Sequence, residues 1–251
     1  MTKKDRHDFI LNYVKENGRI TTNELVERFA CTEDTIRKDF QELSGKGLVQ
    51  RFHGGVERIE NKGVIRYHER SSVQTEVKES LALATVPFLL DKRFLYIDGG
   101  TTNQKIVEAL PRDFSATIVT NAIPIAAKLC EFPNVEAVML GGSLNKAIQN
   151  AEGSLPINQL DLLNFDCYVI GVSSISLTGG ITFPLMSEVQ LKQAALRKSR
   201  EVITAVSKDK LNTIAGFHAA DADVITRIVT NETDASVLKP YRDRGIEVIT
   251  V

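Results

Sequence analysis

The chain has 251 residues, a hydrophobic fraction of 43% and a formal net charge of −1 at pH 7. Its length exceeds one typical domain, and its near-neutral charge excludes a protein that is basic throughout. No apolar run approaches the ~20 residues of a membrane-spanning helix, and Cys31, Cys130 and Cys167 lie too far apart for a zinc site. We therefore expect a cytoplasmic protein of two domains, with reduced thiols and without a metal or other cofactor.

Three helices are predicted in the first fifty residues. Residues 6–16 carry apolar side chains at helical spacing and end at Asn17-Gly18, a typical helix stop. Residues 21–24 form a capping box, in which a Thr hydroxyl and a Glu carboxylate satisfy the first amides of a second helix. Thr32 is placed to cap a third helix after a turn of about three residues, which predicts a helix-turn-helix.

The third helix has one apolar face and one polar face. Ile36, Phe40 and Leu43 recur at spacings of four and three, so they share the buried face. Residues near the start of such a helix reach base edges when it lies in the major groove of DNA. The opposite face carries side chains suited to that role: Thr35, Arg37, Lys38 and Gln41.

A hairpin is predicted next, with strands at residues 48–52 and 56–59 and a turn at His53-Gly-Gly55. The region is not basic in bulk, because residues 1–58 hold eleven Lys and Arg against ten Asp and Glu. The cations gather around the third helix and the hairpin, however, at Arg37, Lys38, Lys46, Arg51 and Arg58. A winged helix-turn-helix that binds DNA is favoured over a protein-protein adaptor, with these candidate contacts: Thr32, Thr35, Arg37, Lys38, Gln41, Arg51 and His53.

An ordered pattern in this region resembles the DeoR family of bacterial transcriptional regulators. The pattern is Arg6-x3-Ile10-x3-Val14, then seventeen residues, then Thr32-x2-Thr35-Ile36-Arg37-Lys38-Asp39, followed by the wing segment Arg51-x-His-Gly-Gly55. Family members usually have serine in place of Thr32 and arginine in place of Lys38. The resemblance implies binding to a double-stranded DNA operator.

Residues 60–74 are polar and lack a steady period, so we predict domains at 1–59 and 75–251 with a linker between them. A helix is expected from about residue 75 to 90, followed by alternating apolar runs and amphipathic helices. This pattern predicts an α/β domain with a mostly parallel sheet. The expected strands are 94–97, 116–119, 135–140, 167–172, 201–206, 224–229 and 247–251, and the expected helices are 102–110, 122–131, 186–199 and 233–244.

The first strand of this domain ends in Asp98-Gly-Gly-Thr-Thr102, directly before a helix. Backbone amides, two hydroxyls and the helix dipole would converge there, which suits a phosphate or another anion. Such turns also serve only to connect elements. The segment is neither a P-loop nor a dinucleotide fingerprint, so a nucleotide is not the expected ligand.

Ligands of parallel sheets bind at the carboxyl ends of the strands, and polar or glycine residues follow other strands as well. Each of these segments could be a plain turn, and Glu188 with Lys192 could be a surface pair on a helix. Taken together they predict a crevice for a polyhydroxylated anion. The candidate residues are Asp98, Gly99, Gly100, Thr101, Thr102, Thr120, Asn121, Gly141, Gly142, Glu188, Lys192 and Lys208.

The DeoR resemblance extends through this region in the segments Asp98–Thr102, Val119–Asn121, Gly141-Gly142 and Ser207-Lys208. It implies a domain that resembles ribose-5-phosphate isomerase and senses a phosphorylated sugar or related metabolite. It further implies a homodimer or homotetramer that acts mostly as a repressor of sugar catabolism. The chain departs from the family at Ser173-Ser174, where a carboxylate is common, so an acceptor-only group has become a donor and acceptor.

A second function remains open from the residues alone, a sugar-phosphate isomerase with a DNA-binding appendage. It would need a general base, for which Asp98 or Glu188 with Lys208 could serve. The missing carboxylate at Ser173-Ser174 leaves fewer acid-base groups, so we expect a sensor and not an enzyme.

Overall fold

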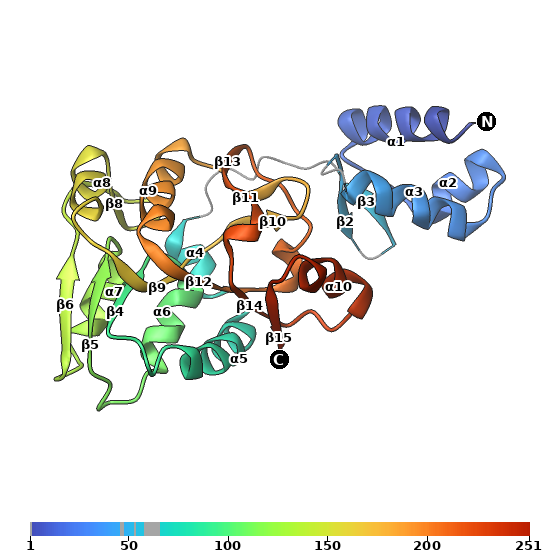
Figure 1. Cartoon of the computed structure of the whole chain (residues 1–251). Coiled ribbons are helices and arrows are strands. Elements are labelled where there is room, and N and C mark those ends of the chain that lie inside the picture. The colour runs from blue at the N-terminus through green and yellow to red at the C-terminus, as the bar shows by residue number, and fades with distance from the viewer. Residues whose placement is uncertain (1, 46–47, 53, 58–65) are drawn as a thin grey trace.

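The computed structural model describes residues 2–45, 48–52, 54–57 and 66–251 (Figure 1). The first part is a winged helix-turn-helix, and the second is an α/β domain built on a seven-stranded sheet. The elements of the first part are α1 (Lys3–Asn17), β1 (Arg19–Thr21), α2 (Thr22–Phe29), α3 (Glu33–Gly45), β2 (Gln50–Phe52) and β3 (Gly55–Glu57).

The three predicted helices of the first part are confirmed, and so are their caps. Thr21 and Glu24 form the capping box at the start of α2, and the Thr35 amide donates to the Thr32 hydroxyl at the start of α3. The apolar faces of the helices meet in one core that includes Ile10, Val14, Leu25, Ile36, Phe40 and Leu43.

The wing is a three-stranded antiparallel sheet in the order β1-β3-β2. Gly54 has φ +95 in the turn between β2 and β3, as the hairpin prediction required. Strand β1 was not predicted, because three residues are too few to show a period of two. His53 and the end of the predicted second strand lie outside the described residues.

All seven strands predicted for the second part exist and form one sheet. They are β4 (Phe94–Ile97), β5 (Ala116–Thr120), β6 (Val135–Met139), β9 (Phe165–Val169), β12 (Ser199–Val206), β14 (Arg227–Thr230) and β15 (Glu247–Thr250). Their order is β15-β14-β12-β9-β4-β5-β6, and every neighbouring pair is parallel.

Helices cover both faces of the sheet, as Figure 1 shows. Leu95 and Ile97 of β4 pack with α5 (Thr75–Thr85), α6 (Thr101–Glu108) and α7 (Ile123–Leu129) on one face. Tyr96 points to the other face, which is covered by α8 (Ser154–Leu160), α9 (Met186–Arg197) and α10 (Ala235–Asp243). A strand alternates its side chains between two faces, so both must be apolar when both are covered.

Several short elements were not predicted. They are the helices α4 (Tyr67–Ser71) and α8, the hairpin β7 (Ser143–Asn145) and β8 (Asn150–Glu152), the small sheet of β10 (Ser174–Ser176), β11 (Gly180–Phe183) and β13 (Phe217–Ala220), and the 3-10 turns η2 (Lys208–Lys210) and η3 (Ala222–Val224). The helix predicted at residues 75–90 is α5 followed by the 3-10 turn η1 (Val86–Phe88). The small sheet joins β11 to β13, which are distant in sequence, and a local pattern does not reveal such pairing. The β7–β8 hairpin and the 3-10 turns are closed by nearby residues but are too short to show a period.

Helix α4 lies inside the predicted linker. The Tyr67 amide donates to the Ala147 carbonyl at 2.7 Å, and the Tyr67 hydroxyl donates to Gln104 of α6. The His68 ring and the Gln149 amide are also hydrogen-bonded, at 2.9 Å. These contacts attach α4 to the second part of the chain.

The strand order reverses between β4 and β9. From β4 the chain continues outward through β5 to β6, whereas β9 continues outward on the other side through β12, β14 and β15. In open parallel sheets the crevice at the carboxyl ends of such a strand pair is the usual ligand site. Asp98 follows β4 and Gly171 follows β9 closely, so both lie at this position.

Candidate functional site

The polar face of α3 is exposed in the winged helix-turn-helix. Thr32, Arg37, Lys38 and Gln41 are exposed, and Thr35 is half-buried. Arg37 pairs with Glu33 one turn earlier, at 3.0 Å. Lys38 has no ion pair among the described residues, so its ammonium is the less compensated of the two charges.

The wing places one further predicted contact at the surface. Arg51 is exposed on β2. The other wing candidate, His53, lies outside the described residues, as do Lys46 and Arg58 of the predicted cationic cluster. The proposed DNA contacts on α3 and β2 stay predictions.

Part of the DeoR-like pattern serves the fold. Ile10, Val14 and Ile36 are fully or almost fully buried in the helical core. The Arg6 guanidinium donates twice to the buried Asp39 carboxylate, at 2.6 and 3.1 Å. This bidentate pair joins α1 to α3, and the hydrogen bond to Asp39 raises the pKa of Arg6.

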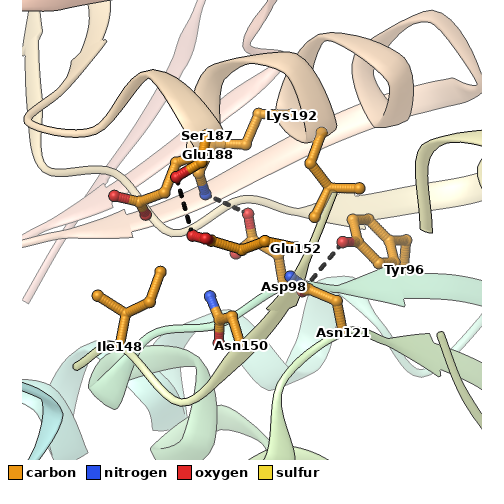
Figure 2. Close-up of a pocket in the computed structure, with 10 residues that line it drawn as sticks. Tyr96, Asp98, Asn121, Ile148, Asn150, Glu152, Ser187, Glu188 and Lys192 are labelled. Atoms are coloured by element: carbon orange, nitrogen blue, oxygen red, sulfur yellow. Dashed lines mark hydrogen bonds and ion pairs between the residues drawn. The ribbon is translucent and has the colours of Figure 1, made fainter. Parts of the chain in front are cut away.

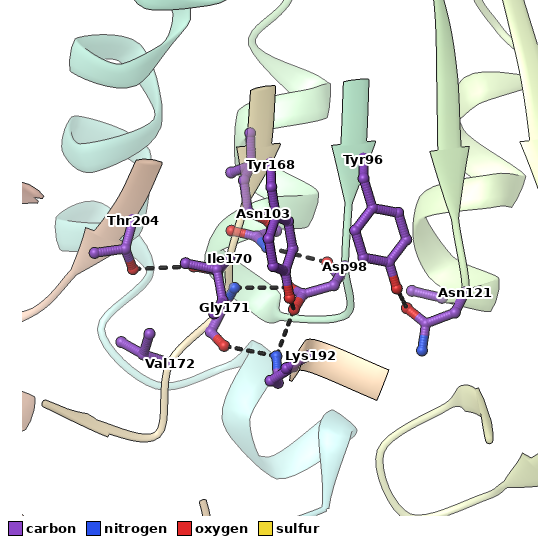
Figure 3. A network of polar contacts seen from close by, with 12 residues as sticks. Tyr96, Asp98, Asn103, Asn121, Tyr168, Ile170, Gly171, Val172, Lys192 and Thr204 are labelled. Carbon is purple, nitrogen blue, oxygen red and sulfur yellow. Dashed lines mark hydrogen bonds and ion pairs between the residues drawn. The ribbon is translucent and has the colours of Figure 1, made fainter. Parts of the chain in front are cut away.

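Asp98 is the centre of a buried polar network at the switch between β4 and β9 (Figure 3). Its Oδ1 accepts from the Gly171 amide at 2.7 Å and from the Asn103 amide group at 3.0 Å. Its Oδ2 accepts from the Tyr168 hydroxyl and from the Lys192 ammonium. The carboxylate therefore has four donors from four different elements or loops.

Lys192 is buried beside Asp98, on helix α9. Its ammonium also donates to the Gly171 carbonyl at 2.8 Å and lies 4.5 Å from the centre of the Phe183 ring. The alternative of a surface pair between Glu188 and Lys192 is ruled out, because Lys192 forms a buried pair with Asp98. Helix α9 packs over the sheet and turns Lys192 inward, which the sequence spacing did not show.

A pocket opens next to this network (Figure 2). Four predicted residues line it, namely Asp98, Asn121, Glu188 and Lys192. The sequence did not indicate the other lining residues: Tyr96, Ile148, Asn150, Glu152, Ser187 and Leu191. Most of these residues lie in the β7–β8 hairpin or on α9. They are not at the carboxyl ends of the strands of the large sheet, where the ligand site was predicted.

The pocket presents several hydrogen-bonding groups around a partly apolar lining. Asn121 accepts from the Tyr96 hydroxyl at 3.0 Å and donates to the Ala151 carbonyl at 3.1 Å, so its orientation is set. Ser187 donates to Glu152 at 3.0 Å across the rim. The lining therefore offers fixed amide and carboxylate groups as hydrogen-bond partners.

Glu188 differs from the other pocket carboxylates. No hydrogen bond or ion pair between described residues involves it. Burial raises the pKa of Glu188, while the positive charges of Lys192 and Arg70 oppose that increase. Glu188 is therefore the pocket acceptor most available to a ligand hydroxyl.

Several predicted residues do not line the pocket. Gly141 and Gly142 pack against α8 and β8, where a Cβ on Gly142 would lie 2.6 Å from the Glu152 carbonyl. The Thr120 hydroxyl accepts from the Ala122 amide at 3.1 Å and so stabilises a turn. The structure gives these three residues a role in local packing.

The Gly99–Thr102 segment forms the start of α6, as predicted. Gly100 precedes the helix without a side-chain cap, so the first amides of α6 have no hydroxyl or carboxylate cap. A Cβ on Gly99 would collide with the Asn150 side chain, which explains glycine at this position. Thr101 and Thr102 are close in sequence to Asp98, which lines the pocket, but they do not line it themselves.

The lysine predicted at the Ser207-Lys208 segment is exposed and does not line the pocket. Lys210, two residues later, points inward instead, and its ammonium donates to the Val172 carbonyl at 3.0 Å. Lys208 is the first residue of the turn η2 and Lys210 is the last, so the turn directs their side chains differently. Ser173 and Ser174 precede and begin β10 and are also absent from the pocket lining.

Two absences hold for residues 2–45, 48–52, 54–57 and 66–251, the described ranges of the chain. These ranges contain no group of His, Cys, Asp and Glu side chains that could bind a metal ion. They also hold no helix with the length and apolar character needed to cross a bilayer.

Two family descriptions match the chain in consecutive segments. A DeoR-like helix-turn-helix domain matches residues 6–62, and a DeoR C-terminal sensor domain matches residues 73–232. The glycerol-3-phosphate regulon repressor of Escherichia coli strain K12 is 28% identical over 249 residues, which cover 99% of each chain. The transcriptional repressor CsqR of the same organism is 26% identical over 250 residues, 99% of this chain and 96% of that one.

Among solved structures, ribose 5 phosphate isomerase A from Neisseria gonorrhoeae aligns with 57% of this chain and 56% of its own, with a TM-score of 0.41 and 15% identity. The family assignment does not depend on that alignment. It rests on the two matched domains, which together span the winged helix-turn-helix and most of the α/β domain. The chain belongs to the DeoR family of DNA-binding transcriptional regulators.

Proposed function

We propose that this regulator is a repressor of a sugar-catabolism operon whose operator binding is controlled by a phosphorylated sugar or related metabolite. The pocket at the β4–β9 switch supports the sensing role, because it joins a fixed polar network to the unpaired Glu188 acceptor. The E. coli relative that is named a glycerol-3-phosphate regulon repressor supports a phosphorylated polyol as the class of ligand.

The exposed face of α3 supports the operator-binding half of the proposal. Lys38 and Arg37 stand near the start of the helix, where a recognition helix meets base edges or phosphates. A double-stranded operator can be selected by the full chain from a random DNA library. Lys38→Ala should then weaken binding and reduce the slope of log affinity against log salt by about one unit if Lys38 contacts a phosphate.

Lys239→Ala serves as the control for that experiment. Lys239 is an exposed cation on α10 that pairs with Asp243, so its removal changes the net charge equally without touching the recognition helix. If Lys38→Ala and Arg37→Ala both bind the selected DNA as the Lys239→Ala variant does, α3 is not the reading surface.

If the α/β domain senses a metabolite, binding of that ligand should shift the equilibrium between two states of the protein that differ in operator affinity. A thermal-shift screen of the full chain against pentose, hexose and triose phosphates should find a ligand that raises the melting temperature. The same ligand should change binding to the selected operator. Asn121→Ala should reduce both effects, because Asn121 lines the pocket with a fixed amide.

We propose a homodimer or homotetramer, since two reading heads would match two operator half-sites. The proposed domains are residues 1–59 and 75–251, joined by residues 60–74, of which helix α4 packs on the second domain. Ligand binding would alter the spacing of the heads and thereby their fit to the half-sites. Light scattering with and without the selected operator checks the assembly.

We propose sensing without turnover. A sugar-phosphate isomerase would need a general base, for which the sequence offers Asp98, Glu188 and Lys208. Asp98 already accepts four hydrogen bonds, and Lys208 is outside the pocket. Glu188 is the remaining pocket carboxylate with a raised pKa. Conversion of a pentose or hexose phosphate that is lost in Glu188→Gln would establish the enzyme instead.

A further inference from the structure

Three cations from three different elements gather near the pocket but are not part of its lining. Arg70 lies on α4, Lys78 on α5 and Lys210 on η2. The Lys78 ammonium donates to the Arg70 carbonyl, and the Lys210 ammonium donates to the Val172 carbonyl, next to the Gly171 carbonyl that binds Lys192. Repulsion between the cations agrees with this placement, because Arg70 and Lys78 both lower the pKa of Lys210, and Arg70 lowers the pKa of Lys78. No ion pair between described residues neutralises any of them.

The cations have donors left over. The Lys78 ammonium donates to the Arg70 and Val73 carbonyls, and the Lys210 ammonium donates to the Val172 carbonyl at 3.0 Å. An ammonium has three donors, so each lysine keeps at least one. The Arg70 Nε atom is buried and has no hydrogen-bond partner. A buried donor without an acceptor is costly unless a ligand supplies one.

The cluster adjoins both the pocket and the start of α6. The Gly171 carbonyl accepts from Lys192 of the pocket, and the next carbonyl, Val172, accepts from Lys210. Arg70 is close enough to Glu188 for each to affect the pKa of the other. Helix α4, which carries Arg70, is also tied to α6 through Tyr67 and Gln104.

We propose that Arg70, Lys78 and Lys210 form the subsite that holds the phosphoryl group of the ligand, beside the uncapped start of α6. The inference rests on the proposed function and adds where the anion binds. A phosphoryl group would give acceptors to the unused donors and relieve the repulsion between three cations. The hydroxyl-bearing part would then extend toward Glu188 and Asn121 in the pocket.

The titration of Lys210 gives the subsite a pH dependence. Burial lowers the pKa of Lys210 to about 8, with Arg70, Lys78 and Lys192 adding to the decrease and the Asp209 carboxylate opposing it. The side chain is charged below that value and neutral above it. Anion binding should therefore weaken as the pH rises through about 8, and the bound anion should move the midpoint upward.

The first experiment uses inorganic phosphate and the full chain, at constant ionic strength maintained with chloride. Phosphate should raise the melting temperature of the wild type and of Lys208→Met, which removes an exposed lysine of the same turn. Lys210→Met and Lys78→Met should increase the apparent dissociation constant by about tenfold. An equal constant in wild type and Lys210→Met would overturn the subsite.

Lys210→Met should fold, because it replaces a cation that burial disfavours with an apolar side chain of similar length. A pH series with sulfate, whose charge is constant between about pH 7 and pH 9, provides a second measurement. The sulfate-induced shift should decline through that range in the wild type and in Lys208→Met. A decline of the same size in Lys210→Met would contradict the assignment.

A third arm separates this inference from the proposed function. A sugar phosphate that changes operator binding is compared with its dephosphorylated sugar and with inorganic phosphate. If the sugar phosphate acts equally on wild type and Lys210→Met, sensing stands and the subsite is wrong. If no sugar phosphate affects operator binding while phosphate still binds through Lys210, the proposed function fails and the anion site remains.

Discussion

The Asp98 carboxylate accepts from Gly171, Asn103, Tyr168 and Lys192. A carboxylate with four donors is fixed in place, because each of its two oxygens accepts two hydrogen bonds. Its role is therefore to hold the carboxyl ends of β4 and β9 and helix α9 in register. Glu188, which lacks such partners, is the freer group of the same pocket.

The residue-scale prediction concerns the buried Asp98–Lys192 pair. Asp98→Asn should lower the free energy of unfolding by about 3–5 kcal/mol, because it leaves the Lys192 ammonium buried without its counter-charge. Urea unfolding measures the loss. The double variant Asp98→Asn/Lys192→Met should lose less than the sum of the two single variants.

Ser187→Ala is the matched control at the rim of the pocket, where Ser187 is exposed and donates one hydrogen bond, to Glu152, among the described residues. It should change the free energy of unfolding by less than about 1 kcal/mol. Similar losses for Asp98→Asn and Ser187→Ala would show that the network does not stabilise the fold.

At the scale of elements, three acid-base contacts between described residues join α1 to α3: Arg6 and His7 with Asp39, and Lys3 with Glu42. Arg6 and Asp39 are largely buried, whereas Lys3 and Glu42 are exposed. The pattern that marks the family includes both residues of the buried pair. Part of that pattern thus joins α1 to α3, and the proposed DNA contacts belong to its exposed part.

Asp39→Asn should therefore lower the free energy of unfolding of the winged helix-turn-helix by about 2–3 kcal/mol, because it removes the negative charge that binds the Arg6 guanidinium. Lys3→Ala removes the exposed pair between the same two helices and should cost about 0.2–1 kcal/mol. Thermal unfolding followed by circular dichroism gives both values. A loss for Asp39→Asn no larger than that for Lys3→Ala would mean that the pair does not position α3.

Local pattern was sufficient for most elements of this chain. The seven strands of the large sheet follow from apolar periodicity, and the capping box of α2 follows from Thr21 and Glu24, three residues apart. Helix α4 and the β7–β8 hairpin were missed, because Tyr67 and His68 are held by Gln104, Ala147 and Gln149. Those contacts join segments that are distant in sequence.

At the scale of the whole molecule, the helical core and the two cores of the α/β sheet contain separate sets of residues. A regulator whose two parts have separate cores can move its DNA-binding part without unfolding the α/β domain. The family matches at residues 6–62 and 73–232 divide the chain in a similar way.

Calorimetry of the full chain should accordingly show two unfolding transitions. A phosphorylated ligand should raise only the transition of the α/β domain, since a ligand stabilises the unit that binds it. Asp39→Asn should lower only the other transition. A single transition that both perturbations move equally would mean that the two parts unfold as one cooperative unit.

Residues close together in the chain were enough to predict the helix-turn-helix, the parallel sheet and the strand ends where a ligand would bind, because backbone periodicity and capping are local properties. They were not enough to separate Lys208 from Lys210 or to pair Lys192 with Asp98. Those outcomes depend on the strand order and on which face of α9 and η2 meets the sheet. Burial and long-range contacts therefore decided which of the predicted polar residues share a pocket.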